Sequence, residues 1–155
     1  MAPKKHRTRH VSEAEAKTYL KKAEEFYQTM LESCRQRRWN SAGLAGVHCA
    51  ISATDAALGI KAKLRSAGER HYEAVELLCT HIIHDNTKTQ SARLTRILGQ
   101  KSIVEYDSRE FTEREASNIT KDVGRYLDWV KTLFEQQTFY FGDIIPISRS
   151  NHAVL

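Results

Sequence analysis

Residues 39–68 read WNSAGLAGVHCAISATDAALGIKAKLRSAG, and between Asn40 and Lys61 the single formal charge is Asp55. Bulky apolar residues recur at helical spacing along one side of this stretch, and small residues cover much of the opposite side. A helix that is apolar on both sides is a buried helix, so we expect this one at the centre of the fold. The bulky side holds Leu44, Val47, Ile51 and Leu58, and the small side holds Ala42, Gly46, Ala50, Ala53 and Ala57.

Three polar residues, His48, Ser52 and Asp55, interrupt the apolar pattern. Their spacing of four and three residues puts them on one side of the helix, next to the bulky stripe. An ionised carboxylate costs free energy there unless it is paired and hydrogen-bonded. Two interpretations are open: a buried polar network that fixes the register of the helices, or the wall of a pocket that binds a polar ligand or a partner.

Helical periodicity also extends on both sides of the central stretch. Ser12 and Glu15 have the spacing of a capping box, which predicts the start of a first helix. Thr112 and Glu115 form a second box, and the helix after it is expected to reach about Gln137. Both boxes precede long apolar stripes, as helix starts should.

The middle of the chain adds further helices. The central helix is expected to be capped by Asn40 or Ser41 and to stop near Ser66, and two more helices are expected over 70–83 and 87–106. No segment alternates as a strand does. The pattern predicts an all-α, antiparallel four- to five-helix bundle with a buried, small-residue-rich second helix.

A chain of 155 residues fits one domain with a real core. We expect a basic flexible tail over 1–11, the helical bundle over 12–140 and a C-terminal tail over 141–155. The net charge of +5 favours acidic partners without being a nucleic-acid signature. The basic tail has two interpretations, a solubilising end or an arm that contacts phosphates.

The expected compartment is the cytoplasm. Cys34, Cys49 and Cys79 form no CxxC pair and fall in apolar helical patterns, which indicates buried thiols in a reducing environment. The first ten residues lack the apolar region of a signal peptide. The central stretch is long enough to span a membrane, but its polar residues and few large apolar ones argue against a span.

Common catalytic and cofactor motifs do not occur in the sequence. P-loop, GxGxxG, HExxH and GxSxG patterns are missing, so a hydrolase of a common class is not favoured. His81 and His84 have a spacing that two metal ligands can use, but no third ligand is specified. Favourable placement at a helix C-terminus explains both histidines more simply, and we expect no metal and no cofactor.

Several segments together resemble a known family. They are AKTYLKKAEEF (16–26), RWNSAGLAGVHCAISATDAAL (38–58), HYEAVELL (71–78) and LGQKSIVEY (98–106), followed by a long closing helix over 111–130. This pattern resembles the HEPN family, which comprises small α-helical proteins of prokaryotes with relatives in eukaryotes. The resemblance covers about residues 14–135 and is strongest over 39–58.

The resemblance implies a bundle of four or five antiparallel helices, often a homodimer. The family includes toxin RNases, inactive relatives and members that bind nucleotides, often encoded beside a minimal nucleotidyltransferase. Its RNases carry R-x(4–6)-H on a late helix, where the histidine transfers a proton and the arginine holds the phosphate. This chain has no histidine between Arg93 and Gln137, and its R-x(5)-H pair, Arg65 and His71, lies between the second and third expected helices.

The leading hypothesis is a non-catalytic HEPN-like module in a toxin–antitoxin or defence-type system. It would be a homodimer that binds a nucleotide, RNA or a protein partner such as a nucleotidyltransferase-like protein, with no membrane association. Its candidate ligand-binding residues are His48, Ser52 and Asp55, with Arg109 or Arg125 as the phosphate contact.

Two alternatives stay open. One is a metal-independent, HEPN-type RNase with a diverged active site, in which Arg65 and His71 are the catalytic residues. The other is a purely structural dimerisation protein, in which the small residues of the central helix serve close packing alone.

Overall fold

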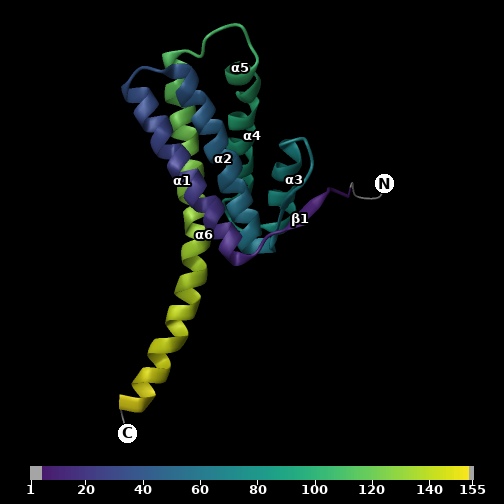
Figure 1. Ribbon diagram of the computed structural model, residues 1–155. Helices are drawn as coiled ribbons and strands as arrows, with labels where there is room; N and C mark the ends of the chain where they lie inside the picture. The colour runs from purple at the N-terminus through teal and green to yellow at the C-terminus, as the bar shows by residue number, and fades with distance from the viewer. Residues whose placement is uncertain (1–4, 154–155) are drawn as a thin grey trace.

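The computed structural model describes the backbone of residues 5–153 and the side chains of residues 5–135. Helices make up most of it, and the four longest run alternately up and down (Figure 1). The expected all-α bundle is confirmed. In chain order the helices are α1 (Glu13–Arg35), α2 (Trp39–Ala62), α3 (Tyr72–His81), α4 (Thr87–Gly99), α5 (Lys101–Glu105) and α6 (Glu113–Ala153).

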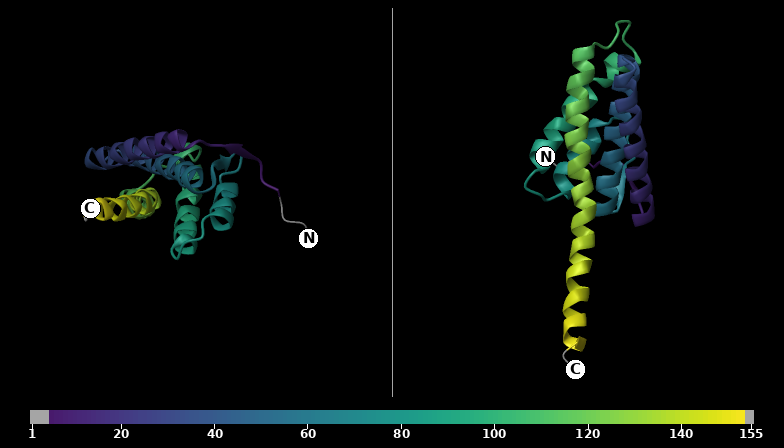
Figure 2. Two further views of the ribbon diagram at one scale, coloured as in Figure 1. Left: turned by 90° about the horizontal axis from the view of Figure 1, so that it is seen from below. Right: turned by 90° about the vertical axis from the view of Figure 1, so that its left-hand side faces the viewer.

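The central helix is α2, which contacts each of the other helices. Figure 2 shows α1 on one side of α2, with α3 and α4 on the other, and α6 running past the end of the bundle. The last helix was expected to stop near Gln137, before a tail over 141–155. That boundary is wrong, because α6 continues to Ala153.

Small residues let the neighbours of α2 approach closely, as expected. The alanines of its small side are fully buried. A Cβ atom on Gly43 would lie 2.5 Å from Val104 Cγ1, and one on Gly59 would lie 2.7 Å from Val11 Cγ1. Such distances leave no room for a side chain, so both glycines are packing requirements. The bulky side is less uniform, since Leu44 is 38% exposed.

By length and composition, α2 is the one helix of the described residues that is apolar enough to cross a membrane. Within its most apolar window of 18 residues, 78% of the residues are buried inside the bundle. The core helix of a bundle passes the same test, so this finding is weak evidence for a membrane span.

The N-terminal segment corrects two expectations, a flexible tail over 1–11 and the absence of strands. Strand β1 (Thr8–His10) pairs antiparallel with strand β2 (Leu64–Ser66), placing Arg9 opposite Arg65. Val11 is 1% exposed and packs on α2. Residues 5–11 therefore form an ordered part of the fold, whereas 1–4 lie outside the described residues. Three-residue strands are too short to show an alternating sequence pattern.

The two capping boxes are confirmed. The Ser12 hydroxyl accepts a hydrogen bond from the Glu15 amide at 3.1 Å, and the Glu15 carboxylate accepts one from the Ser12 amide at 2.7 Å. Thr112 and Glu115 repeat the arrangement at the start of α6. Each box satisfies two amides that a helix start leaves without partners.

The expected ends of α2 are wrong. The helix begins at Trp39, and Asn40 caps nothing: its side-chain oxygen accepts a hydrogen bond from the Phe111 amide at 2.7 Å, which ties α2 to the segment before α6. At the other end α2 stops at Ala62, because Lys63 adopts a left-handed conformation with φ of 55°. This residue turns the chain into β2, a turn that a non-glycine residue rarely makes.

The helices expected over 70–83 and 87–106 also differ from the structure. The first is shorter, and the second is divided into α4 and α5 at Gly99 and Gln100. The three cysteines were expected to be buried, but Cys49 alone is buried, whereas Cys34 is partly exposed and Cys79 is exposed.

Candidate functional site

A cavity of about 100 Å³ lies between α2, α4 and the segment that leads from β2 into α3. We call it the Asp55 pocket. Aliphatic side chains of Ile51, Leu94 and Leu98 form part of its wall. Gly68 and Ala74 also line it, and its polar lining is supplied by Thr54, Asp55, Arg65, Ser66, Arg70 and His71.

The backbone turn after α2 brings this lining together. Asp55 lies two turns before the end of α2, and Lys63 then reverses the chain. Pairing with β1 fixes β2, which places Arg65 at the pocket. Gly68, Arg70 and His71 then complete the wall, together with Ala74 in the first turn of α3. The turn at Lys63 and the strand pair thus bring Arg65 and His71 next to Asp55 of α2.

Asp55 has an unusual ionisation for a carboxyl group. Burial raises its pKa to about 6, and the positive charge of Arg65 opposes this shift only in part. The group therefore changes charge close to neutral pH. The sequence predicted that an ionised Asp55 would need a partner. Arg65 supplies the nearby positive charge that favours the ionised form.

Arg65 is incompletely satisfied. Its guanidinium lies over the Tyr19 ring, with Cζ 5.8 Å from the centroid, and Nη1 donates a long hydrogen bond of 3.4 Å to the Ser66 carbonyl. Its Nε is buried and has no hydrogen-bond partner within the described residues. A buried donor without an acceptor typically costs about 1–3 kcal/mol, so this atom is a ready contact for an anionic ligand.

His71 is the titratable imidazole of the pocket. Burial lowers its pKa, the positive charges of Lys101 and His48 lower it further, and Glu105 opposes them. The ring is therefore neutral at neutral pH and can accept a proton or a hydrogen bond. Arg65 and His71, proposed from sequence as an alternative catalytic pair, share one pocket with Asp55, which the sequence had assigned to a separate site.

The other polar residues named on α2 lie outside this lining. His48 Nε2 is 3.8 Å from Glu105 Oε1, and its ring contacts Phe26 at 5.6 Å between centroids. Ser52 is partly buried on α2 and does not line the pocket. Conversely, the sequence did not indicate Thr54, whose hydroxyl lies 2.6 Å from that of Tyr126, because a threonine on an apolar helix carries no distinctive pattern.

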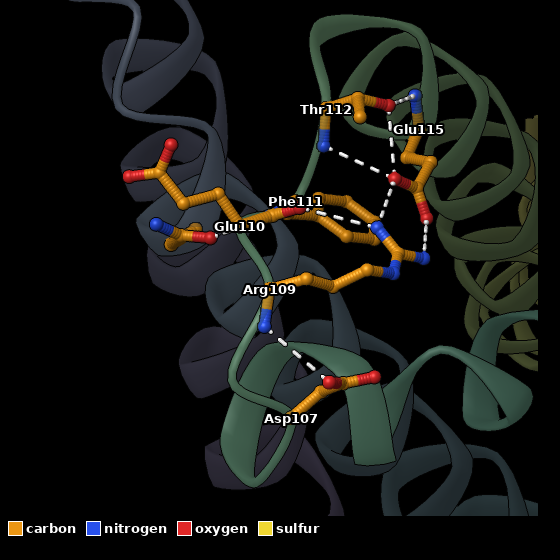
Figure 3. Close-up of polar contacts among 7 residues, drawn as sticks. Asp107, Arg109, Glu110, Phe111, Thr112 and Glu115 are labelled. Carbon is orange, nitrogen blue, oxygen red and sulfur yellow. Dashed lines mark hydrogen bonds and ion pairs between the residues drawn. The ribbon is translucent and has the colours of Figure 1, made fainter.

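Arg109 is engaged in an ion pair at the start of α6 (Figure 3). Its two terminal nitrogens donate to the two carboxylate oxygens of Glu115, both at 2.9 Å. This bidentate contact lowers the pKa of Glu115 to about 2, with help from Thr112. Arg109 thus stabilises the capping box and does not line the Asp55 pocket.

Arg125 lies elsewhere. It is exposed and lines a broad hollow between α4, α5 and α6, separate from the Asp55 pocket. Of the five residues first named as ligand contacts, Asp55 alone lines the Asp55 pocket. Within the described side chains, no cluster of three or more His, Cys, Asp and Glu residues is arranged to hold a metal ion.

The fold and its pocket define the class of this protein: a small all-α bundle built around a small-residue helix, with a charged cavity against that helix. No family model matches the chain, and no curated protein matches it. Among solved structures it is similar to an archaeal HEPN homologue, with 18% sequence identity and a TM-score of 0.57. The match covers 76% of this chain and 95% of that chain. The protein therefore has a HEPN-like fold, as its sequence segments suggested.

Proposed function

We propose that this protein is a binding module whose Asp55 pocket takes the phosphoryl group of a nucleotide or of an RNA end. The observation that supports the proposal is the shared lining: Arg65, Arg70 and His71 meet a carboxylate, Asp55, in one cavity. Guanidinium groups suit phosphate because their N–H donors match its oxygens in pairs. The unpartnered Nε of Arg65 supplies one such donor.

Size and charge favour part of a nucleotide within the cavity. A protein-core cavity of about 150 Å³ accommodates a benzene ring, so about 100 Å³ holds a phosphoryl group or a sugar edge but not a whole nucleotide. The base would extend beyond the lining. Asp55 then accepts hydrogen bonds from ribose hydroxyls, the role that a carboxylate plays beside a sugar.

The strand pair gives a second reason to expect an anion beside Arg65. Arg9 and Arg65 are directly opposite in the β1–β2 pairing, so their side chains leave the same face of the ribbon. Like charges in directly opposed positions destabilise a strand pair. An anion bound by Arg65 would relieve this repulsion.

Thermal-shift and calorimetric titrations with AMP, with ATP and with sulfate would test the proposal, because a ligand of the folded state raises the melting temperature. Arg70 is exposed, so Arg70→Ala should keep the fold and weaken binding of all three at least tenfold. Asp55→Asn should reduce the shift with AMP but not with sulfate. Arg125→Ala, which removes an equal charge elsewhere, is the matched control; equal affinity in Arg70→Ala and Arg125→Ala would overturn the proposal.

A ribonuclease is the second candidate, and the presence of Arg65, His71 and Asp55 in one pocket favours it. In metal-independent cleavage the RNA 2′-hydroxyl attacks the adjacent phosphorus, a base takes its proton and an acid protonates the departing 5′-oxygen. Neutral His71 suits the base and protonated Asp55 the acid, while Arg65 would hold the phosphate. Cleavage of structured or unstructured RNA that His71→Ala abolishes would make the protein an enzyme.

We also propose the setting that its HEPN-like fold suggests: a cytoplasmic homodimer in a toxin–antitoxin or defence-type system, paired with a nucleotidyltransferase-like protein. Light scattering coupled to size exclusion tests the dimer. Co-expression with the product of the neighbouring gene tests the partner, and a monomer that elutes alone from both experiments would remove this part of the proposal.

A further inference from the structure

A hollow of about 780 Å³ lies between α4, α5 and α6, on the opposite side of α4 from the Asp55 pocket. We call it the α4–α6 groove. Leu94 and Leu98 of α4 line the pocket, whereas Arg96, Ile97 and Gln100 line the groove. At about 100° per residue these two sets point in different directions from the same helix. The groove is thus a separate surface, and its role is independent of the function proposed for the pocket.

The groove carries surplus positive charge. Its two carboxylates are already neutralised: Asp122 accepts hydrogen bonds from Arg93 and from Arg96, at 3.4 and 3.1 Å. Glu115 is held by Arg109, outside the groove lining. Arginine thus saturates the acidic groups, and any further cation in the groove is a net excess.

That excess is supplied by Lys121 and Arg125. Both are exposed, and neither forms an ion pair with a side chain among residues 5–135. They lie four residues apart on α6, where like charges repel and destabilise the helix. Two unopposed cations on the wall of a groove favour an acidic partner, because complementary charge attracts it and orients it.

Three isoleucines lie among the polar and charged residues that line the groove. Ile97 and Ile119 are 1% and 3% exposed, so the partly buried Ile103 offers most of the aliphatic surface, and Gln100 and Asn118 add amides. A Cβ atom on Gly99 would meet no atom within 4 Å, so the wall is open at that point. A trough between two helices with aliphatic side chains in its lining fits an amphipathic helix.

Two observations decide which acidic partner fits best. Among the described side chains, the lining contains no aromatic ring for bases to stack on, which disfavours single-stranded RNA as the occupant. The lining itself carries surplus positive charge, so the same groove of a second copy would repel it, which disfavours a symmetric contact between copies through this surface. We propose that the α4–α6 groove docks an acidic amphipathic helix of a partner protein, with its apolar side on the isoleucines and its carboxylates on Lys121 and Arg125.

The test uses a designed peptide and NMR. An 18-residue helix with leucines on one face and glutamates on both flanks would be titrated into isotopically labelled full-length protein, following backbone amide shifts. The expected result is saturable binding, with the largest shifts in α4 and α6 around Gly99 and Lys121. The same peptide with lysine in place of glutamate should not bind.

Three variants make the result specific. Lys121→Ala with Arg125→Ala should weaken binding at least tenfold, and Gly99→Leu should block it, since the added side chain meets open space and leaves the fold intact. Lys88→Ala, an exposed cation of α4 outside the groove, should bind the peptide as the unmutated protein does. Shifts confined to other surfaces, or affinity unchanged in the first two variants, would overturn the proposal. Oligouridylate binding that the same variants abolish would assign the groove to nucleic acid instead.

Discussion

The two sides of α4 handle charge in opposite ways. In the Asp55 pocket, burial displaces the pKa values of Asp55 and His71 toward each other's range and leaves an arginine donor without an acceptor among the described residues. In the α4–α6 groove, arginines saturate the carboxylates, and the surplus groups are cations at the surface. Charge that is buried becomes sensitive to protons, whereas charge that is exposed becomes sensitive to salt. Four measurements would test that contrast.

The largest effect is expected where the groove is compared with the core. Gly43→Val should destabilise the protein by about 3 kcal/mol, because the added atoms meet Val104 and Phe111 at distances of 2.5 to 2.9 Å. Gly99→Ala should be neutral or stabilise by up to about 1 kcal/mol, since nothing surrounds the new methyl group. Urea denaturation of both variants measures the difference. Comparable losses would show that the groove is filled.

A carboxylate on each side of α4 should respond to neutralisation with opposite sign. The folded-state pKa of Asp55 is about 6, above its ordinary value of 3.8, so its contribution to stability is lost as pH rises through this range. Asp55→Asn should therefore stabilise the ligand-free protein at pH 8, by up to about 3 kcal/mol, and leave it unchanged at pH 3.5. Asp122→Asn should instead destabilise it by about 1 kcal/mol, because Arg93 and Arg96 lose the negative charge that pairs with them. Urea denaturation of both variants at pH 8 and pH 3.5 measures these changes. If both variants changed the free energy of unfolding in the same direction at pH 8, the contrast would be wrong.

Ligand binding at the two sites should depend on different conditions, pH for the pocket and salt for the groove. Sulfate stays a dianion between pH 8 and pH 5.5, while Asp55, whose pKa is about 6, loses most of its negative charge. Sulfate should bind the pocket roughly tenfold more tightly at pH 5.5, a difference of about 1.4 kcal/mol. Binding of the acidic peptide should hardly change with pH and should weaken with salt. Calorimetry at two pH values and two salt concentrations checks this, and a flat sulfate profile would contradict the pocket assignment.

The smallest effect concerns the two groove cations. Lys121→Ala in the ligand-free protein should stabilise α6 by a few tenths of a kcal/mol, because it removes the repulsion with Arg125 one turn away. Thermal denaturation in low salt would detect it, and the gain should vanish in 1 M salt. A loss of stability would mean that Lys121 has a partner.

Much of the fold was readable in the sequence because it rests on local signals. The small-residue pattern over 39–60 indicated a buried central helix, and the S-x-x-E and T-x-x-E boxes marked two helix starts within a residue. The turn at Lys63 was not readable, since a left-handed lysine has no sequence signature. The strand pair was missed for a related reason: its partners are distant in sequence, and three residues are too few for alternation to appear.

The site was predicted in pieces. Asp55 stood out as a lone carboxylate in an apolar helix, and Arg65 with His71 stood out by spacing, but no sequence pattern joins them. Their meeting depends on the turn and the strand pair, which are tertiary features. The ion pair of Arg109 with Glu115 was not predicted, because a guanidinium six residues before a capping glutamate gives no sign that the two will pair.

The β1–β2 pairing has a consequence for the order in which the chain folds during synthesis. Strand β1 is synthesised before α1, yet its partner emerges more than fifty residues later, after both helices of the α1–α2 hairpin. Contacts between distant residues close after local ones, because a long loop costs more entropy to close. Arg65 is fixed only when that ribbon closes. The pocket is therefore completed after the α1–α2 hairpin, and a chain that begins at residue 11 would lack the strand that positions Arg65.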